Sequence, residues 1–171
     1  MTLNTLNLAS DKDAFSWFMQ TCTSEKWCIK MVKHRPFENI NRLKSVANEL
    51  WGCMENTDFM QAFQGHPMIG DINTLREKYA QTKALASNEQ SGTKGADDAI
   101  LLALQAFNKA YLERHGFIFI IFASGLSANT MLSALEKRLP NTTEIEIQNA
   151  AKEQIKITLN RIDKAFNSTQ E

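Results

Sequence analysis

The 171-residue chain is poor in the residues from which several kinds of functional site are built. It has only three histidines, three cysteines and seven glycines. The histidines form no His-x-x-x-His pair and the cysteines no Cys-x-x-Cys pair, which are spacings typical of zinc sites. No glycine-rich phosphate loop and no Gly-x-Ser-x-Gly elbow is present. The sequence therefore predicts a protein that works without a bound metal or nucleotide.

Charge of one sign and long apolar runs are also missing. Lys+Arg and Asp+Glu both number 19, so the formal net charge is zero, and no charged surface favours nucleic acid or an anionic membrane. The longest apolar run, residues 117–123, is too short to span a bilayer. The N-terminal MTLNTLNLASDKD does not resemble a signal peptide, and the C-terminal Ser168-Thr169-Gln170-Glu171 is not a peroxisomal address. We expect a cytoplasmic protein without nucleic acid or membrane partners.

The three cysteines, Cys22, Cys28 and Cys53, fit neither a disulfide framework nor a metal site, because their number is odd and their spacing irregular. A reducing compartment is the natural setting for such thiols. Cys22 and Cys28 lie among apolar residues, so we expect them in the core as small hydrophobic side chains.

The spacing of apolar residues predicts an all-α fold, a compact helical bundle in which residues 1–171 form one domain. The expected helices begin at a Ser10/Asp13 cap, cover about 27–33 before a break at His34-Arg35-Pro36-Phe37, run from Asn39 towards Phe63, and run from Asp71 to about Ser87. After a polar loop at 87–95, further helices are expected at 100–112, ending at Gly116, at 127–138, and from a Thr143/Glu146 capping box to Phe166.

Residues 116–123, GFIFIIFA, have the β-branched and aromatic composition of a strand. No second convincing strand exists to pair with this segment, and a lone strand leaves its backbone N–H and C=O groups without partners. We therefore interpret it as a buried extended segment or a helical turn whose backbone groups are directed at something other than a sheet.

The stretch Gly65-His66-Pro67-Met68-Ile69-Gly70-Asp71 is the most unusual part of the chain. His66 stands between a glycine and a proline, two strong backbone punctuators, in a loop that joins two apolar-faced helices. An imidazole presented in this way titrates near neutral pH and suits proton transfer. The alternative is that His66 only hydrogen-bonds a helix end.

Glu89 and Arg161 allow two interpretations in the same way. In Ser87-Asn88-Glu89-Gln90 the spacing of Ser87 and Gln90 fits a capping box, yet an acid beside an amide also offers proton transfer and amide recognition. Arg161 lies near the border of the apolar face of the last helix. It is either one more charge on an exposed surface or a guanidinium that holds a carboxylate bidentately.

Taken together, these motifs resemble one family. Their order along the chain is Leu6-Asn7, His34-Arg35-Pro36-Phe37, Gly65-His66-Pro67-Met68-Ile69-Gly70, Ser87-Asn88-Glu89-Gln90, Gly116-Phe117-Ile118-Phe119-Ile120 and Arg161. This order resembles the OHCU decarboxylases, where OHCU is 2-oxo-4-hydroxy-4-carboxy-5-ureidoimidazoline, over about residues 6–166. One departure is Met68, where many members carry a charged residue.

The resemblance implies a cofactor-free, all-α enzyme, commonly a homodimer, that converts OHCU to (S)-allantoin in urate degradation. It implies that His66 and Glu89 are catalytic and that Arg161 binds substrate. The further substrate-binding positions that it implies are Pro67, Ser87, Gln90, Phe117, Ile118, Phe119 and Ile120. Residues 117–120 would contribute backbone N–H and C=O groups, which would explain the unpaired extended segment.

Two alternatives remain at this point. One is a helical binding module without catalysis. The other is a decarboxylase or hydrolase that acts on another ureido or purine-derived ring, because the shape of a site determines its substrate and cannot be read from the sequence. The sequence also leaves open which of His66 and Glu89 transfers each proton.

Overall fold

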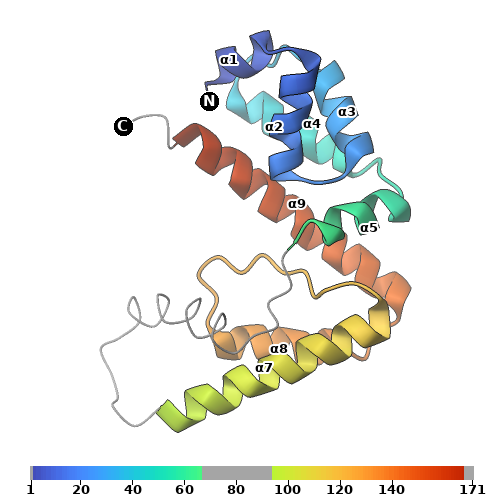
Figure 1. Ribbon diagram of the computed structural model, residues 1–171, viewed down its shortest axis with the longest axis vertical. Helices are drawn as coiled ribbons and strands as arrows, with labels where there is room; N and C mark the ends of the chain where they lie inside the picture. Colours follow the sequence, from blue (N-terminus) through green and yellow to red (C-terminus); the bar gives the residue numbers. More distant parts are fainter. Residues whose placement is uncertain (1, 67–93, 168–171) are drawn as a thin grey trace. The chain divides into compact units, whose positions relative to one another are not determined.

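The computed structural model describes residues 2–66 and 94–167 (Figure 1). All regular structure in these two ranges is helical, which confirms the predicted all-α class. The predicted helix at 71–87 lies outside the described residues, as does the predicted loop up to residue 93. Within the described ranges, no helix is both long and apolar enough to cross a membrane.

The described chain packs as two compact units. The first comprises Met1–His66 and Asn149–Glu171, and the second comprises Pro67–Gln148. The helices are α1 (Leu3–Leu8), α2 (Asp11–Thr21), α3 (Glu25–Lys33), α4 (Ile40–Trp51), α5 (Asn56–Gln64), α7 (Lys94–His115), α8 (Ala128–Arg138) and α9 (Thr143–Asn167). The one-domain prediction for residues 1–171 stays a prediction.

The first unit has an aromatic core in which α3 packs against α2, α4 and α5. The Phe18 ring meets the rings of Trp27 and Phe37 edge-on, at centroid distances of 5.9 and 6.3 Å. Trp27 and Trp51 each donate the indole N–H to a backbone carbonyl, so their burial leaves no polar atom without a partner. Cys22 and Cys28 are buried free thiols in this unit, as predicted.

Two of the motifs that carry the family resemblance hold the start of the chain onto this core. The Asn7 amide exchanges two hydrogen bonds with the backbone of Phe37, at 2.8 and 2.9 Å. The Arg35 guanidinium donates to the carbonyls of Leu6 and Ala9, which are left without partners at the end of α1. The function of Asn7 and Arg35 in this unit is therefore to join α1 to the loop after α3.

Several predicted helix ends are confirmed. The Ser10 hydroxyl accepts from the Asp13 N–H at 3.1 Å, α3 stops before the His34–Phe37 break, and α7 ends at Gly116, whose φ of +78° favours glycine. The predicted helix from Asn39 towards Phe63 is in fact two helices. It breaks after Gly52 because Glu55 and Asp58 form a capping box that starts α5.

The second unit contains the extended segment. Residues 116–123 follow α7 without pairing in any strand of the described ranges. Phe117 and Ile120 are buried, and Ile118 and Phe119 are half-buried. α7 begins earlier than predicted, since Lys94 and Gly95, expected in a loop, are already helical.

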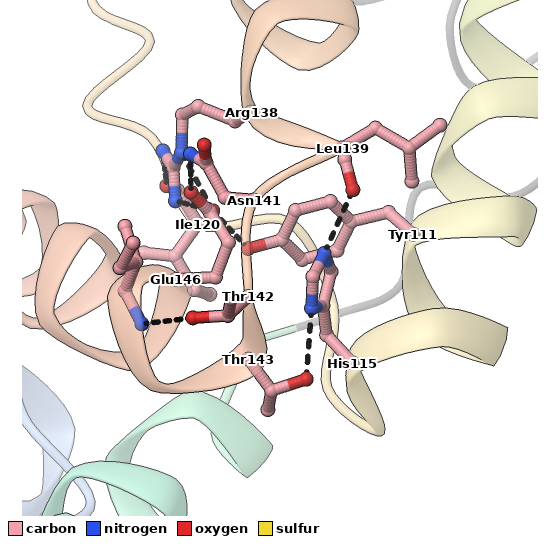
Figure 2. Close-up of polar contacts among 10 residues, drawn as sticks. Tyr111, His115, Ile120, Arg138, Leu139, Asn141, Thr142, Thr143 and Glu146 are labelled. Carbon is pink, nitrogen blue, oxygen red and sulfur yellow. Dashed lines mark hydrogen bonds and ion pairs between the residues drawn. The ribbon is translucent and has the colours of Figure 1, made fainter.

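A buried carboxylate organises this unit (Figure 2). Glu146 is fully buried, and its carboxylate accepts from the hydroxyl of Tyr111 at 2.5 Å and from the amide of Asn141 at 2.7 Å. Arg138 donates to the same carboxylate from Nε at 2.8 Å, and its Nη2 lies 2.8 Å from the carboxylate as an ion pair. Burial, with a contribution from the Glu146 hydrogen bond, raises the pKa of Tyr111, so its hydroxyl remains a donor.

The capping box predicted for Thr143 and Glu146 is therefore wrong. α9 starts at Thr143, and the preceding Thr142 hydroxyl accepts from the Ile145 N–H. Glu146 faces away from the helix end, towards Arg138 and Tyr111, because the carboxylate gains an ion pair and several hydrogen bonds there.

Replacing Glu146 by alanine should lower the free energy of unfolding by about 3–5 kcal/mol, because it leaves the Arg138 charge buried without its partner. The double variant Arg138→Met/Glu146→Leu should lose less, since it leaves no buried charge. Urea unfolding followed by far-ultraviolet circular dichroism measures both.

The matched control is Lys109→Ala, which removes the exposed Lys109–Glu113 pair of α7. Pairs of this kind contribute little, so its unfolding midpoint should equal that of the parent protein. A Glu146→Ala midpoint equal to that of Lys109→Ala would contradict the importance given to the buried network.

Candidate active site

His66 is placed by the end of α5. The helix stops at Gln64 with Gly65 as its C-cap, and the His66 N–H donates to the Phe63 carbonyl at 3.2 Å. The Thr23 hydroxyl lies 3.2 Å from each of the carbonyls of Gln61 and Ala62. These bonds satisfy carbonyl groups that the end of a helix leaves without partners.

Gly65 is needed because Thr23 lies so close to it. A Cβ atom at position 65 would overlap the side chain of Thr23, although the φ of Gly65 is an ordinary −75°. The glycine thus lets Thr23 bind the end of α5, and this contact determines where His66 leaves the helix. The sequence marked Gly65 as a backbone punctuator, and the structure gives close packing as the reason.

The imidazole of His66 is half-buried and hydrogen-bonded to α9. Its Nε2 lies 2.5 Å from Oε1 of Gln154. The Nε2 of Gln154 in turn donates to the Thr158 hydroxyl at 3.1 Å. Gln154 and Thr158 have exposed fractions of 0% and 1%, so these bonds replace water that the side chains cannot reach.

Gln154, Thr158 and Arg161 lie on one face of α9, at the i, i+4 and i+7 positions of a helix. The sequence singles out only Arg161 of the three. Ile155 and Leu159 are apolar residues that directly follow Gln154 and Thr158 in the chain. Those two residues are half-buried, whereas Gln154 and Thr158 are fully buried. The signal that was missed is the repeat of polar residues at helical spacing between Ala151 and Ile162.

Arg161 reaches from α9 to the end of α2. Its Nη1 donates to the Thr21 carbonyl at 3.0 Å, where the helix dipole favours a positive charge. This bond uses one of the five N–H donors of the guanidinium. Arg161 is half-buried, so it is not a surface charge, and its planar group can also bind an anion bidentately.

The surroundings of His66 favour its neutral form. Burial is the main cause that lowers its pKa from the usual 6.5, and the positive charge of Arg161 acts in the same direction. The hydrogen bond to Gln154 opposes the shift. At neutral pH the imidazole is therefore uncharged and able to accept a proton, as a general base must be.

The Cys22 thiol lies near Thr158 and Arg161 but is not a nucleophile. Burial raises its pKa to about 11, although the Ser24 N–H, the Thr158 hydroxyl and the Arg161 charge favour the thiolate. The thiol is thus protonated at neutral pH and inert.

The extended segment in the second unit is held by Arg138. The Nη1 of Arg138 donates to the Ile120 carbonyl at 2.8 Å (Figure 2). Its guanidinium carbon lies 4.5 Å from the centre of the Phe119 ring, which is a cation–π contact. The Tyr111 ring meets the rings of Phe117 and Phe119 edge-on, at 5.7 and 5.1 Å. The backbone of this segment is thus fixed by Arg138 and Tyr111.

The remaining predicted site residues, Pro67, Ser87, Glu89 and Gln90, lie outside the described residues. Within the described ranges, no group of three or more His, Cys, Asp or Glu side chains is arranged to hold a metal ion. Of the predicted residues, the structure thus places His66 and Arg161 in the first unit, where Gln154 of α9 links His66 to the helix that carries Arg161, and it describes Phe117, Ile118, Phe119 and Ile120 in the second.

Comparisons with known proteins agree with the resemblance seen in the sequence. The chain is 32% identical to the uric acid degradation bifunctional protein TTL of Arabidopsis thaliana over 146 residues, which are 85% of this chain and 45% of that protein. It is 21% identical to the 2-oxo-4-hydroxy-4-carboxy-5-ureidoimidazoline decarboxylase of Haloferax volcanii, covering 98% of each chain. The present sequence thus spans less than half of the first relative and nearly all of the second.

Solved structures give the same result. A crystal structure of OHCU decarboxylase, determined in the presence of (S)-allantoin, superposes with a TM-score of 0.70 at 29% identity, covering 93% of this chain and 99% of that one. The family model described as OHCU decarboxylase matches residues 7–163, a range that includes every motif quoted above except Leu6. By its sequence and its fold, this chain belongs to the OHCU decarboxylase family.

Proposed function

We propose that this chain decarboxylates OHCU to (S)-allantoin in urate degradation, without a cofactor, as a carboxy-lyase. The observation that carries the proposal is that, in a member of this family, the His66 imidazole is hydrogen-bonded to Gln154 on the face of α9 that also carries Arg161. His66 can accept a proton and Arg161 can bind an anion, which are the two tasks that this reaction sets. Family membership favours this function over a non-catalytic helical module.

The substrate supplies its own electron sink. In OHCU the carboxylate is attached to the ring carbon that carries the hydroxyl, next to the ring C=N carbon that carries the ureido group. When the bond to CO₂ breaks, its electron pair forms a C=C bond and the imine electrons move to the ring nitrogen, which takes up a proton from water. Loss of the hydroxyl proton then gives the carbonyl, and protonation of the ureido-bearing carbon creates the stereocentre of allantoin.

Arg161 binds the substrate carboxylate or a carbonyl edge in this proposal. A charge-assisted bond to the carboxylate orients the scissile C–C bond, and the Thr21 carbonyl keeps the guanidinium in place. His66 accepts the hydroxyl proton, and Glu89 shares the proton transfers with it. Each group that transfers a proton contributes typically about 10²- to 10⁴-fold to the rate.

The other substrate contacts follow the family resemblance. Pro67, Ser87 and Gln90 surround the ring, and the backbone of residues 117–120 binds the ureido group. The hydrogen bond from Arg138 to the Ile120 carbonyl supports this role, because it holds the extended backbone in one conformation. We also propose a homodimer located in the cytoplasm, as the resemblance implies.

His66→Ala should reduce kcat for OHCU by about 10²- to 10⁴-fold, because it removes the proton acceptor. Stopped-flow mixing with freshly prepared OHCU and detection of released CO₂ measures the rate. The control His34→Ala changes an exposed histidine of the first unit and should keep the parent rate. A His66→Ala enzyme as fast as the parent protein would rule out the assignment of His66.

Arg161→Lys should raise KM more than it lowers kcat, since a lysine keeps the charge but loses the bidentate geometry. Arg161→Gln should lower kcat/KM by roughly a further factor of 10, which corresponds to the loss of a charge-assisted hydrogen bond. Initial rates over a range of OHCU concentrations separate the two constants. Equal KM values in all three proteins would show that Arg161 does not bind the substrate.

The pH dependence has a definite sign. Because the pKa of His66 is lowered below 6.5 in the folded protein, the acid limb of kcat/KM should lie below pH 6.5. The unfolded state then binds the proton more readily than the folded state, so the free energy of unfolding falls as the pH drops through 6.5 and levels off below the folded-state pKa. In His66→Gln this component of the fall should vanish. An acid limb above pH 6.5 would contradict the lowered pKa.

A further inference from the structure

We propose that Gln154 is a positioning residue that fixes the tautomer of His66 and so makes Nδ1 the nitrogen that exchanges protons with the substrate. The inference rests on the proposed role of His66 and adds to it a residue, and an atom, that the sequence did not suggest. It depends on the order of hydrogen bonds from the imidazole into the core of the first unit.

The first step is the bond between His66 and Gln154. The amide oxygen Oε1 lies 2.5 Å from Nε2 of His66. An amide oxygen only accepts hydrogen bonds, so Nε2 must be the nitrogen that carries the proton. In a neutral imidazole the other nitrogen, Nδ1, then has the free lone pair.

The second step is the orientation of the Gln154 amide, because a reversed amide would place its NH₂ group against His66 and reverse the tautomer. In the structure the amide turns Oε1 to His66 and its NH₂ group to the Thr158 hydroxyl, whose oxygen accepts from Nε2 of Gln154 at 3.1 Å. This leaves Oε1 for His66.

The third step is burial. Gln154 is 0% and Thr158 is 1% exposed, so water does not compensate a bond that is lost when the amide turns over. An unsatisfied buried polar group costs about 1–3 kcal/mol. The amide therefore keeps one orientation, and it holds the imidazole through a group that stays neutral at every pH.

The chemical consequence concerns a single proton. The substrate hydroxyl transfers its proton to Nδ1, and the imidazolium that forms keeps its Nε2–H bond to Gln154. Donation of the same proton from Nδ1 restores the neutral imidazole. Burial and the Arg161 charge together disfavour the imidazolium more than the Gln154 oxygen favours it. The imidazolium therefore returns its proton readily.

Long-range ¹H–¹⁵N correlation spectra of the full chain above pH 7.5 (about one unit above the usual His pKa) test the tautomer directly. The chain has three histidines, and His66→Gln assigns the signals of His66. We expect a protonated Nε2 in the parent protein and a mixture of tautomers in Gln154→Leu. The same variant should lower kcat by about 10- to 100-fold, the range seen when a partner that orients a functional histidine is lost, with little change in KM.

Gln154→Glu provides the conservative rescue. It keeps an acceptor for Nε2–H, so it should restore the tautomer, and its negative charge should raise the pKa of His66 and move the acid limb of kcat to higher pH. The matched control is Gln61→Leu in the same unit. Gln61 accepts the Glu25 N–H at 2.9 Å, and its loss should change neither the tautomer nor kcat.

The outcomes separate the two proposals. A parent protein with Nδ1 protonated overturns the inference, even if Gln154→Leu fails to fold. An unchanged tautomer and kcat in Gln154→Leu overturns it as well. If His66→Ala is fully active while the spectra show Nε2 protonated, the catalytic role of His66 fails and with it the role of Nδ1, although the hydrogen bond to Gln154 stands.

Discussion

A polar side chain that α9 removes from water must find a partner inside the protein, and this requirement determines how the candidate residues of each unit are held. Desolvation of an unpaired polar group costs about 1–3 kcal/mol, and more for a charge. In the second unit the requirement falls on Glu146, whose partner Arg138 also holds the backbone of Ile120. In the first unit it falls on Gln154, whose partner is His66. The same bonds that satisfy buried groups thus position the residues that face the substrate in our proposal.

This arrangement explains how a protein with so few reactive side chains suits the proposed decarboxylation. The substrate provides the electron sink, so the protein has to orient a carboxylate and move protons. Both tasks depend on preorganised groups more than on reactive ones. His66 is kept neutral by burial and by Arg161, and Arg161 is itself anchored at the end of α2. Arginine and histidine, rather than cysteine or a metal, carry the proposed chemistry.

The sequence predicted what local rules determine. Apolar spacing gave the all-α class, Ser10 and Gly116 gave helix ends, and the motif order gave the family. Prediction from the sequence failed where a contact with a residue distant in the chain decides between two possible local structures. Glu146 has the spacing of a capping box with Thr143, yet its carboxylate forms a buried ion pair with Arg138 instead. Gln154 and Thr158 are polar by type and were left out of the buried face, because the partner of the Gln154 oxygen is His66, which is distant in sequence. Pro67, Ser87, Glu89 and Gln90 remain predictions from the family resemblance.

The handedness of the product tests the central claim most directly. Spontaneous decarboxylation in water protonates a planar intermediate from both faces and gives racemic allantoin, whereas an enzyme that positions the proton donor protonates one face. Circular dichroism of the allantoin formed from fresh OHCU should therefore show a signal of the (S) enantiomer that grows with protein concentration. Racemic product at the background rate, at every protein concentration, would contradict the account.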